Sequence, residues 1–171
     1  MQLISIIMPY YKKINYIKRA IKSVINQSYK KYELIIVYDD KCLDDYHKIK
    51  SFIGNNKKIR FIKNKKNIGA GKSRNNGIKN SNGNIITFID SDDTWHPKKL
   101  EKQLNYLNRN KYDFVFCGYK KIYKKRSIKV TSSSKFLDYK NLLKSCEIGL
   151  STVMISKKII NKNLFFNLKT Q

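Results

Sequence analysis

The 171-residue sequence has few cysteines and no long apolar run, and each shortage excludes a class of protein. Its three cysteines, Cys42, Cys117 and Cys146, are widely spaced and odd in number, which argues against a disulfide framework, a zinc site or a redox motif. No stretch approaches the roughly twenty apolar residues that a membrane span needs. The apolar run at residues 3–8 is too short for a signal peptide and no basic segment precedes it. We therefore expect a cytosolic protein with reduced thiols.

Acidic residues are also scarce. The sequence holds 12 Asp and Glu against 37 Lys and Arg, which gives a formal net charge of +25. Such a charge attracts phosphorylated substrates and anionic lipid surfaces, so peripheral association with the inner face of the cell membrane is one expectation. Nucleic-acid binding would require a basic stripe with interleaved aromatic residues. Because the lysines are instead scattered among Asn, Ile and Tyr residues, we expect no nucleic-acid partner.

No internal repeat and no linker rich in proline, glycine or serine divides the chain, so residues 1–171 are expected to form one domain. Short apolar runs alternate with stretches of helical spacing. The runs expected to be strands are residues 3–8, 33–37, 59–62, 84–89 and 114–117. Helices are expected between them, with Asn15 capping the first and Pro97 in the first turn of the fourth. This order predicts an α/β fold, a doubly wound and mostly parallel sheet with helices on both faces.

After residue 117 the alternation of apolar runs and helical spacing is less regular. Residues 119–123 and 127–130 are expected to pair as strands across a turn at 124–126. A short helix is expected at 139–145 and a further strand at 152–155.

The least expected feature of so basic a chain is the acidic stretch Asp90-Ser91-Asp92-Asp93, which follows the fourth predicted strand. Carboxylates this close repel one another and raise each other's pKa values, so such a cluster usually holds a cation. Hard oxygen ligands suit Mg²⁺ or Mn²⁺. The alternative is an exposed loop that caps the helix beginning near Pro97.

Other polar groups follow the neighbouring strands, at the edge where parallel sheets bind ligands. Pro9, Tyr10 and Tyr11 follow the first strand, and Asp39 follows the second. A glycine-containing stretch at residues 67–77, expected to be a loop and then a weak helix, adds Lys72 and Arg74 as partners for phosphate. A nucleotide would use all of these groups together: a base to stack, a ribose to hydrogen-bond and a diphosphate that needs a cation. The two tyrosines read singly as surface aromatics, and Asp39-Asp40 also reads as the start of a turn.

Five segments in order resemble the family 2 glycosyltransferases of the GT-A fold. They are Ser5-Ile6-Ile7-Met8-Pro9-Tyr10-Tyr11, residues 20–29, residues 32–39, Asn67-Ile68-Gly69 with Ser73-Arg74-Asn75, and Phe88-Ile89-Asp90-Ser91-Asp92-Asp93. The resemblance extends from about residue 3 to about residue 155.

The resemblance implies a nucleotide-sugar donor, usually linked to UDP, held together with Mn²⁺ or Mg²⁺. Asp90-Ser91-Asp92 matches the family's DxD motif, and Asp39 matches the carboxylate that contacts uracil. The implied donor-binding residues are Pro9, Tyr10, Tyr11, Asp39, Asn67, Arg74 and Asp90, and the implied metal ligands are Asp90, Asp92 and Asp93.

The resemblance also divides the chain into a donor-binding half at about 3–118 and part of an acceptor half at 119–171. It implies inverting transfer of a sugar to a glycan or lipid-linked acceptor in bacterial surface polysaccharide synthesis, with a carboxylate, often in a Glu-Asp pair, as general base. No Glu-Asp pair follows Asp93, and the motif would begin at about Gln171, so we expect a truncated enzyme whose base lies beyond the end. The alternative is a nucleotide-sugar-binding module that lacks the base.

Overall fold

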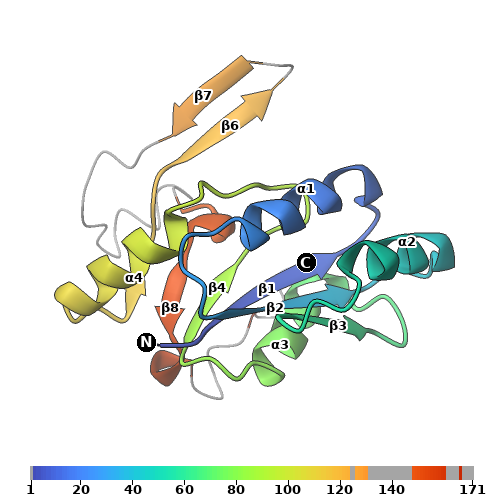
Figure 1. Ribbon diagram of the computed structural model, residues 1–171, viewed down its shortest axis with the longest axis horizontal. Helices are drawn as coiled ribbons and strands as arrows, with labels where there is room; N and C mark the ends of the chain where they lie inside the picture. Colours follow the sequence, from blue (N-terminus) through green and yellow to red (C-terminus); the bar gives the residue numbers. More distant parts are fainter. Residues whose placement is uncertain (1, 124–125, 131–147, 161–165, 167–171) are drawn as a thin grey trace.

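The computed structural model describes residues 2–123, 126–130, 148–160 and 166 (Figure 1). Its main sheet has six strands in the order β3-β2-β1-β4-β8-β5. These strands are β1 (Ile4–Tyr10), β2 (Tyr32–Tyr38), β3 (Ile59–Lys63), β4 (Ile85–Phe88), β5 (Phe114–Val115) and β8 (Met154–Ser156). The helices are α1 (Ile14–Ile25), α2 (Leu43–Ile53), α3 (Gly69–Lys79) and α4 (Lys99–Arg109), with single 3₁₀ turns η1 (Leu150–Thr152) and η2 (Lys157–Ile159).

The sheet is parallel over β3, β2, β1 and β4, as predicted. The strand expected near residues 152–155 exists as β8, but it runs antiparallel to both β4 and β5 and lies between them. Nothing in the local sequence predicted this position. It brings the residues before β8 alongside the loop that follows β4.

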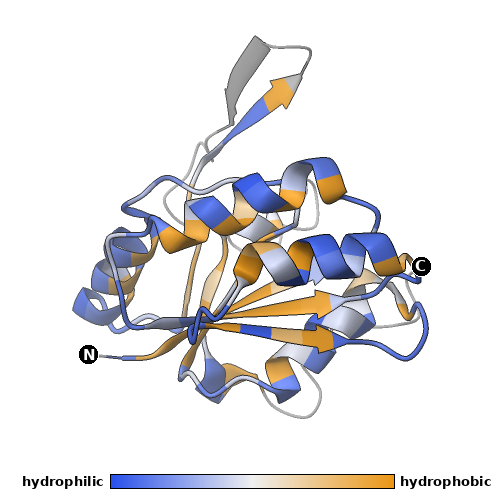
Figure 2. Cartoon of the chain, turned by 45° about the vertical axis from the view of Figure 1, so that its right-hand side comes forward, coloured by the Kyte–Doolittle hydropathy of each residue, from blue (hydrophilic) through white to orange (hydrophobic). Residues whose placement is uncertain are grey.

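Successive side chains of β1 point to opposite faces of the sheet. Ile6 and Met8 pack with the apolar sides of α1, α2 and α4 in the larger core cluster. Ile7 points the other way, toward Ile78 of α3 and Phe88 of β4. Figure 2 shows the apolar strands between helices whose hydrophobic stripes face them. Helices cover both faces, which confirms the doubly wound prediction.

Two local expectations about the helices, the cap at Asn15 and the position of Pro97, were wrong. Helix α1 begins at Ile14, one residue before the predicted cap Asn15, and no side chain caps it. The stretch at 67–77 is a loop and then a helix, as predicted; the helix begins at Gly69, where Asp39 at the end of β2 caps it, as described below. Pro97 lies before α4, whose first residue is Lys99.

A separate two-stranded hairpin projects from the body of the molecule (Figure 1). It consists of β6 (Tyr119–Tyr123) and β7 (Arg126–Val130), antiparallel as predicted. The helix expected at 139–145 lies outside the described residues. Within the described part of the chain, no helix has the length and apolar character to cross a membrane.

Candidate functional site

A pocket of about 390 Å³ lies where the carboxyl ends of β1, β2 and β4 meet. Strand β1 is the switch point of the sheet, because β2 and β4 lie on opposite sides of it, and open α/β sheets bind ligands at such points. The pocket is lined by Pro9, Tyr10, Tyr11, Lys13, Asp39, Asn67, Gly69, Ala70, Ser73, Arg74, Asp90, Ser91 and Asp92. The structure therefore brings together all of the predicted site residues except Asp93 and Lys72, which do not line the pocket.

Asp39 forms one side of this pocket, and its carboxylate anchors the start of α3. It accepts hydrogen bonds from the backbone N–H of Gly69 at 2.8 Å and of Ile68 at 2.9 Å, and from Asn64 Nδ2 at 2.8 Å. Asn67 Nδ2 donates to the Asp39 carbonyl at 2.8 Å. A carboxylate at a helix N-terminus is favourable both for the unpaired N–H groups and for the helix dipole. Asp39 thus fixes the backbone of residues 67–69 as a wall of the pocket.

The neighbouring Asp40 has a simpler role. Its carboxylate accepts hydrogen bonds from the backbone N–H groups of Lys12, Lys41 and Cys42. The turn alternative considered for Asp39-Asp40 therefore describes Asp40, whereas Asp39 reaches across to α3.

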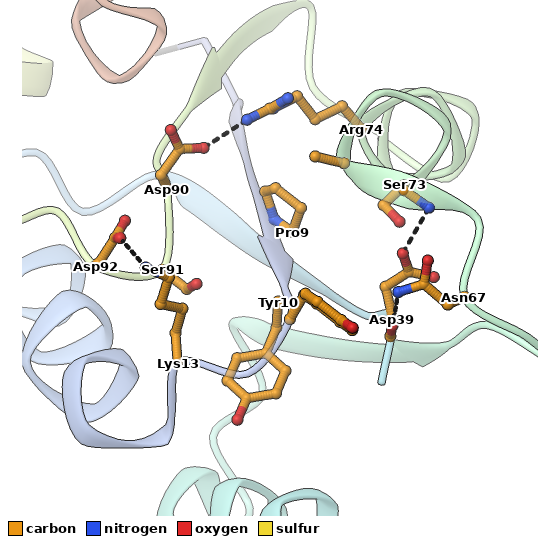
Figure 3. A pocket seen from close by; sticks show the side chains of 13 residues that line it. Pro9, Tyr10, Lys13, Asp39, Asn67, Ser73, Arg74, Asp90, Ser91 and Asp92 are labelled. Atoms are coloured by element: carbon orange, nitrogen blue, oxygen red, sulfur yellow. Dashed lines mark hydrogen bonds and ion pairs between the residues drawn. The ribbon is translucent and has the colours of Figure 1, made fainter. Parts of the chain in front are cut away.

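Asp90 and Asp92 lie on the opposite side of the pocket, with Pro9 between the two sides (Figure 3). Arg74 Nη2 donates to Asp90 Oδ1 at 2.6 Å, and Lys13 Nζ lies 2.9 Å from Asp92 Oδ2. Arg74 extends from α3 and Lys13 from the residue before α1, so two segments distant in sequence each bring a cation to the acidic stretch. Among the described residues, Arg74 Nε is buried without a hydrogen-bond acceptor.

Asp93 points to a different partner. Ser151 Oγ donates to Asp93 Oδ2 at 2.5 Å. Partial desolvation raises the pKa of Asp93; the hydrogen bond from Ser151 opposes this shift, and the charges of Asp90 and Asp92 add to it. Within the described part of the chain, no three metal-binding side chains converge. Each of the three carboxylates is paired separately in this structure, and their joint role as ligands of one cation stays a prediction.

Helix capping, the alternative for the acidic stretch, is not what these residues do. Helix α4 begins after Lys98 without a side-chain cap. The stretch is instead tied to other elements: Arg19 donates to the Asp92 carbonyl, and the backbone N–H of Trp95 donates to Ser23 Oγ.

Tyr10 does not offer the stacking face that was expected. Its ring is fully buried and lies parallel to Tyr38, with centroids 5.0 Å apart, and its hydroxyl donates to Asp45 at 2.6 Å. Even positions of β1 face the core under α1 and α2, so Tyr10 follows Met8 inward. Tyr11 is 47% exposed and remains the aromatic face at this edge.

Ser151 is the main residue that sequence reasoning missed. Besides its bond to Asp93, its Oγ accepts from the backbone N–H of Asp90 at 3.0 Å, and its carbonyl accepts from Trp95 Nε1 at 2.8 Å. Ser151 therefore braces both ends of the acidic stretch. No local signal marks it, since its position depends on where β8 enters the sheet. Lys13 was missed as well, although its place after the first strand end was a usable signal.

Comparisons with known proteins identify the family of the chain. Residues 5–166 match the sequence model described as Glycosyl transferase family 2. The chain belongs to this family.

An uncharacterized glycosyltransferase of Rickettsia felis is 36% identical over 95% of the chain and 27% of its own length. The glucosyltransferase WfgD of Escherichia coli, named as acting from UDP-Glc on α-D-GlcNAc-diphosphoundecaprenol, is 33% identical over 93% of the chain and 62% of its length. TuaG of Bacillus subtilis, a putative teichuronic acid biosynthesis glycosyltransferase, is 32% identical over 99% and 68%.

Two solved structures share the GT-A fold. Residues 1–349 of TarS from S. aureus, in complex with UDP-GlcNAc, superpose with a TM-score of 0.65 at 24% identity, over 75% of this chain and 37% of that one. The mannosyltransferase PcManGT from Pyrobaculum calidifontis, in complex with GDP-Man and Mn²⁺, gives a TM-score of 0.72 at 14% identity, over 96% and 47%. At these identities the likeness establishes the fold. The family 2 chain described here spans about a quarter of the rickettsial relative and about two thirds of WfgD and TuaG.

Proposed function

We propose that this chain forms the donor-binding part of a glycosyltransferase that takes a sugar from a UDP-linked donor. The observation that carries the proposal is the two-sided pocket, with Asp39 and the start of α3 on one side and the acidic stretch on the other. A nucleotide-sugar is long and has chemically different ends, so it suits such a pocket. TarS, solved in complex with UDP-GlcNAc, and WfgD, whose name includes UDP-Glc, support the choice of UDP.

The uridine end lies on the Asp39 side in this proposal, with Asn67 and the exposed ring of Tyr11 beside it. The diphosphate lies on the other side, between Asp90, Asp92 and the cations Lys13 and Arg74. Lys13 and Arg74 neutralise phosphate charge there, and the unpaired Nε donor of Arg74 fits an anion at this end.

The carboxylates that line the pocket can supply one or two ligands to a divalent cation, which would complete its coordination with phosphate oxygens. Mg²⁺ and Mn²⁺ sites in phosphate-binding proteins commonly take one or two protein carboxylates and fill the remaining positions with water and phosphate oxygens. Asp92 is the proposed principal ligand and Asp90 the second, because both line the pocket, whereas Asp93 is held by Ser151. The cation would neutralise charge on the departing diphosphate. PcManGT, solved with Mn²⁺, supports this choice.

The acceptor is proposed to be lipid-linked, in the synthesis of a bacterial surface polysaccharide on the cytosolic side of the membrane. WfgD and TuaG support this part through the acceptor and pathway in their names. Inversion at the anomeric carbon requires a general base to take the acceptor proton, and among residues 3–118 we assign no residue to that role.

Calorimetric titration with UDP and Mn²⁺ tests the site. Wild type should bind UDP in the presence of Mn²⁺, and Asp92→Asn should weaken that binding at least about tenfold, about 1.4 kcal/mol. The matched control is Asp113→Asn, which removes the same charge from the exposed pair with Lys158, 2.8 Å apart, outside the pocket. If the affinity for UDP changes neither on removal of Mn²⁺ nor in Asp92→Asn, the proposed metal site is wrong. If wild type does not bind UDP, the proposed donor is wrong.

A further inference from the structure

Asn75 follows Arg74 in α3 and pairs with a residue that is far away in sequence. Its Oδ1 accepts a hydrogen bond from the backbone N–H of Phe166 at 3.0 Å, and its Nδ2 donates to the Phe166 carbonyl at 3.2 Å. One amide side chain thus satisfies both main-chain groups of residue 166. The two bonds fix the backbone of residue 166 against α3, and other contacts aim its side chain.

The ring of Phe166 lies against the guanidinium of Arg74. Arg74 Cζ lies over the ring, 5.4 Å from its centroid. The ring of Phe88 in β4 meets Phe166 edge to face, with centroids 5.4 Å apart and planes at 90°. Phe88 precedes Asp90 by two residues. Phe166 therefore contacts both of the elements that the Arg74–Asp90 ion pair joins.

The charge of Arg74 is largely withdrawn from water. Its side chain is only 14% exposed, and Nη2 donates to Asp90 Oδ1 at 2.6 Å (Figure 3). Its Nε has no acceptor in the part of the chain that the structure describes. A buried charge is unfavourable unless it is paired, and an aromatic face is a favourable neighbour for a guanidinium. Because the ring face occupies no N–H donor, it stabilises Arg74 and leaves the donors available to an anion.

We propose that Asn75 and Phe166 are positioning residues that hold the guanidinium of Arg74 at the diphosphate end of the pocket. Asn75 places the backbone of residue 166, and the ring of Phe166 packs against the guanidinium. Arg74 is then ordered before the anion arrives, which reduces the entropy lost on binding. The identity of that anion rests on the proposed function, whereas the contact between ring and guanidinium is present without any ligand.

Calorimetric titration with UDP and Mn²⁺ measures what the ring contributes. Phe166→Leu keeps an apolar side chain beside Phe88 but removes the aromatic face, and should lower the affinity for UDP about threefold to tenfold. Phe166→Tyr restores the face and should bind UDP within about twofold of wild type. The matched control is Phe52→Leu, which removes a ring whose centroid is 5.6 Å from Lys18 Nζ and which lies outside the pocket. The control should leave the affinity unchanged.

Double variants separate the positioning of Arg74 from a general effect on the fold. In an Arg74→Gln background, Phe166→Leu should change the affinity for UDP less than about twofold, because the group that the ring holds is absent. Asn75→Ala should reproduce the loss seen in Phe166→Leu, and the two losses should not add. Equal losses with and without Arg74 would overturn the proposal, and so would a Phe166→Leu protein that binds UDP like wild type.

Nuclear magnetic resonance without nucleotide tests the contact independently of the donor. The Nε–H signal of Arg74, assigned by its loss in Arg74→Gln, should move downfield in Phe166→Leu, because a ring face shields the protons above it. The signal should not move in Phe52→Leu. If it does not move in Phe166→Leu, the proposal is wrong. If it moves but wild type binds no UDP, the proposed donor is wrong and the positioning of Arg74 stands. Retained circular dichroism and thermal unfolding show that each variant is folded.

Discussion

At the scale of single residues, the acidic stretch is positioned by contacts that cross most of the chain. Arg74 and Lys13 supply the cations, and Ser151 holds the backbone at Asp90 and the carboxylate of Asp93. A pocket that must hold a diphosphate needs its carboxylates fixed before the ligand arrives, because ordering them on binding would cost affinity. Ser151 is therefore a positioning residue in the proposed function.

Replacing Ser151 tests this role. Ser151→Ala removes a hydrogen bond to a carboxylate and one to a backbone N–H, so the affinity for UDP with Mn²⁺ should fall about five- to tenfold. The free energy of unfolding should fall by only about 1–2 kcal/mol. Calorimetry gives the first quantity and urea denaturation the second. Ser28→Ala is the control, since Ser28 Oγ donates to Glu101 at 2.6 Å outside the pocket. Equal UDP affinities in the two variants would refute the positioning role.

At the scale of elements, one glycine allows α3 to lie close to the sheet. A Cβ added at Gly77 would lie 2.5 Å from Ile7 Cγ2 and 3.4 Å from Val37 Cγ2. The close approach sets the height of α3 over β1 and β2, and so determines where Arg74 reaches Asp90. A Cβ added at Gly71, six residues earlier in the same helix, would meet only an ordinary contact at 3.5 Å.

The two glycines should respond oppositely to alanine. Gly77→Ala forces the helix away from the sheet or displaces Ile7, and should lower the free energy of unfolding by about 1–3 kcal/mol. Gly71→Ala should raise it by up to about 1 kcal/mol, since alanine is the better helix former. Urea unfolding of both variants provides the comparison. A Gly77→Ala protein as stable as wild type would show that α3 does not depend on this contact.

At the scale of the whole molecule, one buried cation links stability to pH. Lys99 is buried, with Nζ 4.0 Å from the centre of the Trp95 ring and 3.4 Å from Thr87 Oγ1. Burial lowers the pKa of Lys99 to about 7. In the unfolded chain the group titrates near 10.4, so above pH 7 the unfolded state binds a proton that the folded state has released. The contribution of Lys99 to the free energy of unfolding therefore rises with pH above 7 and is constant below pH 7.

This linkage predicts a difference between wild type and Lys99→Met. The variant should be the more stable protein below pH 7, and its advantage should shrink as pH rises from 7 to 8.5, by at most about 1.4 kcal/mol per pH unit. The pH range of this prediction ends at 8.5 because burial also raises the pKa of Cys117. At higher pH, thiols ionise in the unfolded chain, and the contribution of Cys117 then lowers the stability as pH rises. Denaturation at pH 6.5, 7.5 and 8.5 measures the difference. A constant difference would mean that Lys99 keeps an ordinary pKa in the folded state.

The sequence by itself determined the repeating units and the edge of the sheet at which the pocket forms. Periodicity along the chain encodes helices and strands locally, and strands joined by helices must run parallel, so Asp39 and Asp90 had to meet at one edge. Only the tertiary structure decided that the ring of Tyr10 turns into the core, that Lys13 and Arg74 pair with the acidic stretch, and that β8 brings Ser151 beside it. These outcomes depend on which strand pairs with which and on the space left between packed layers, and neither is encoded in any single stretch of the chain.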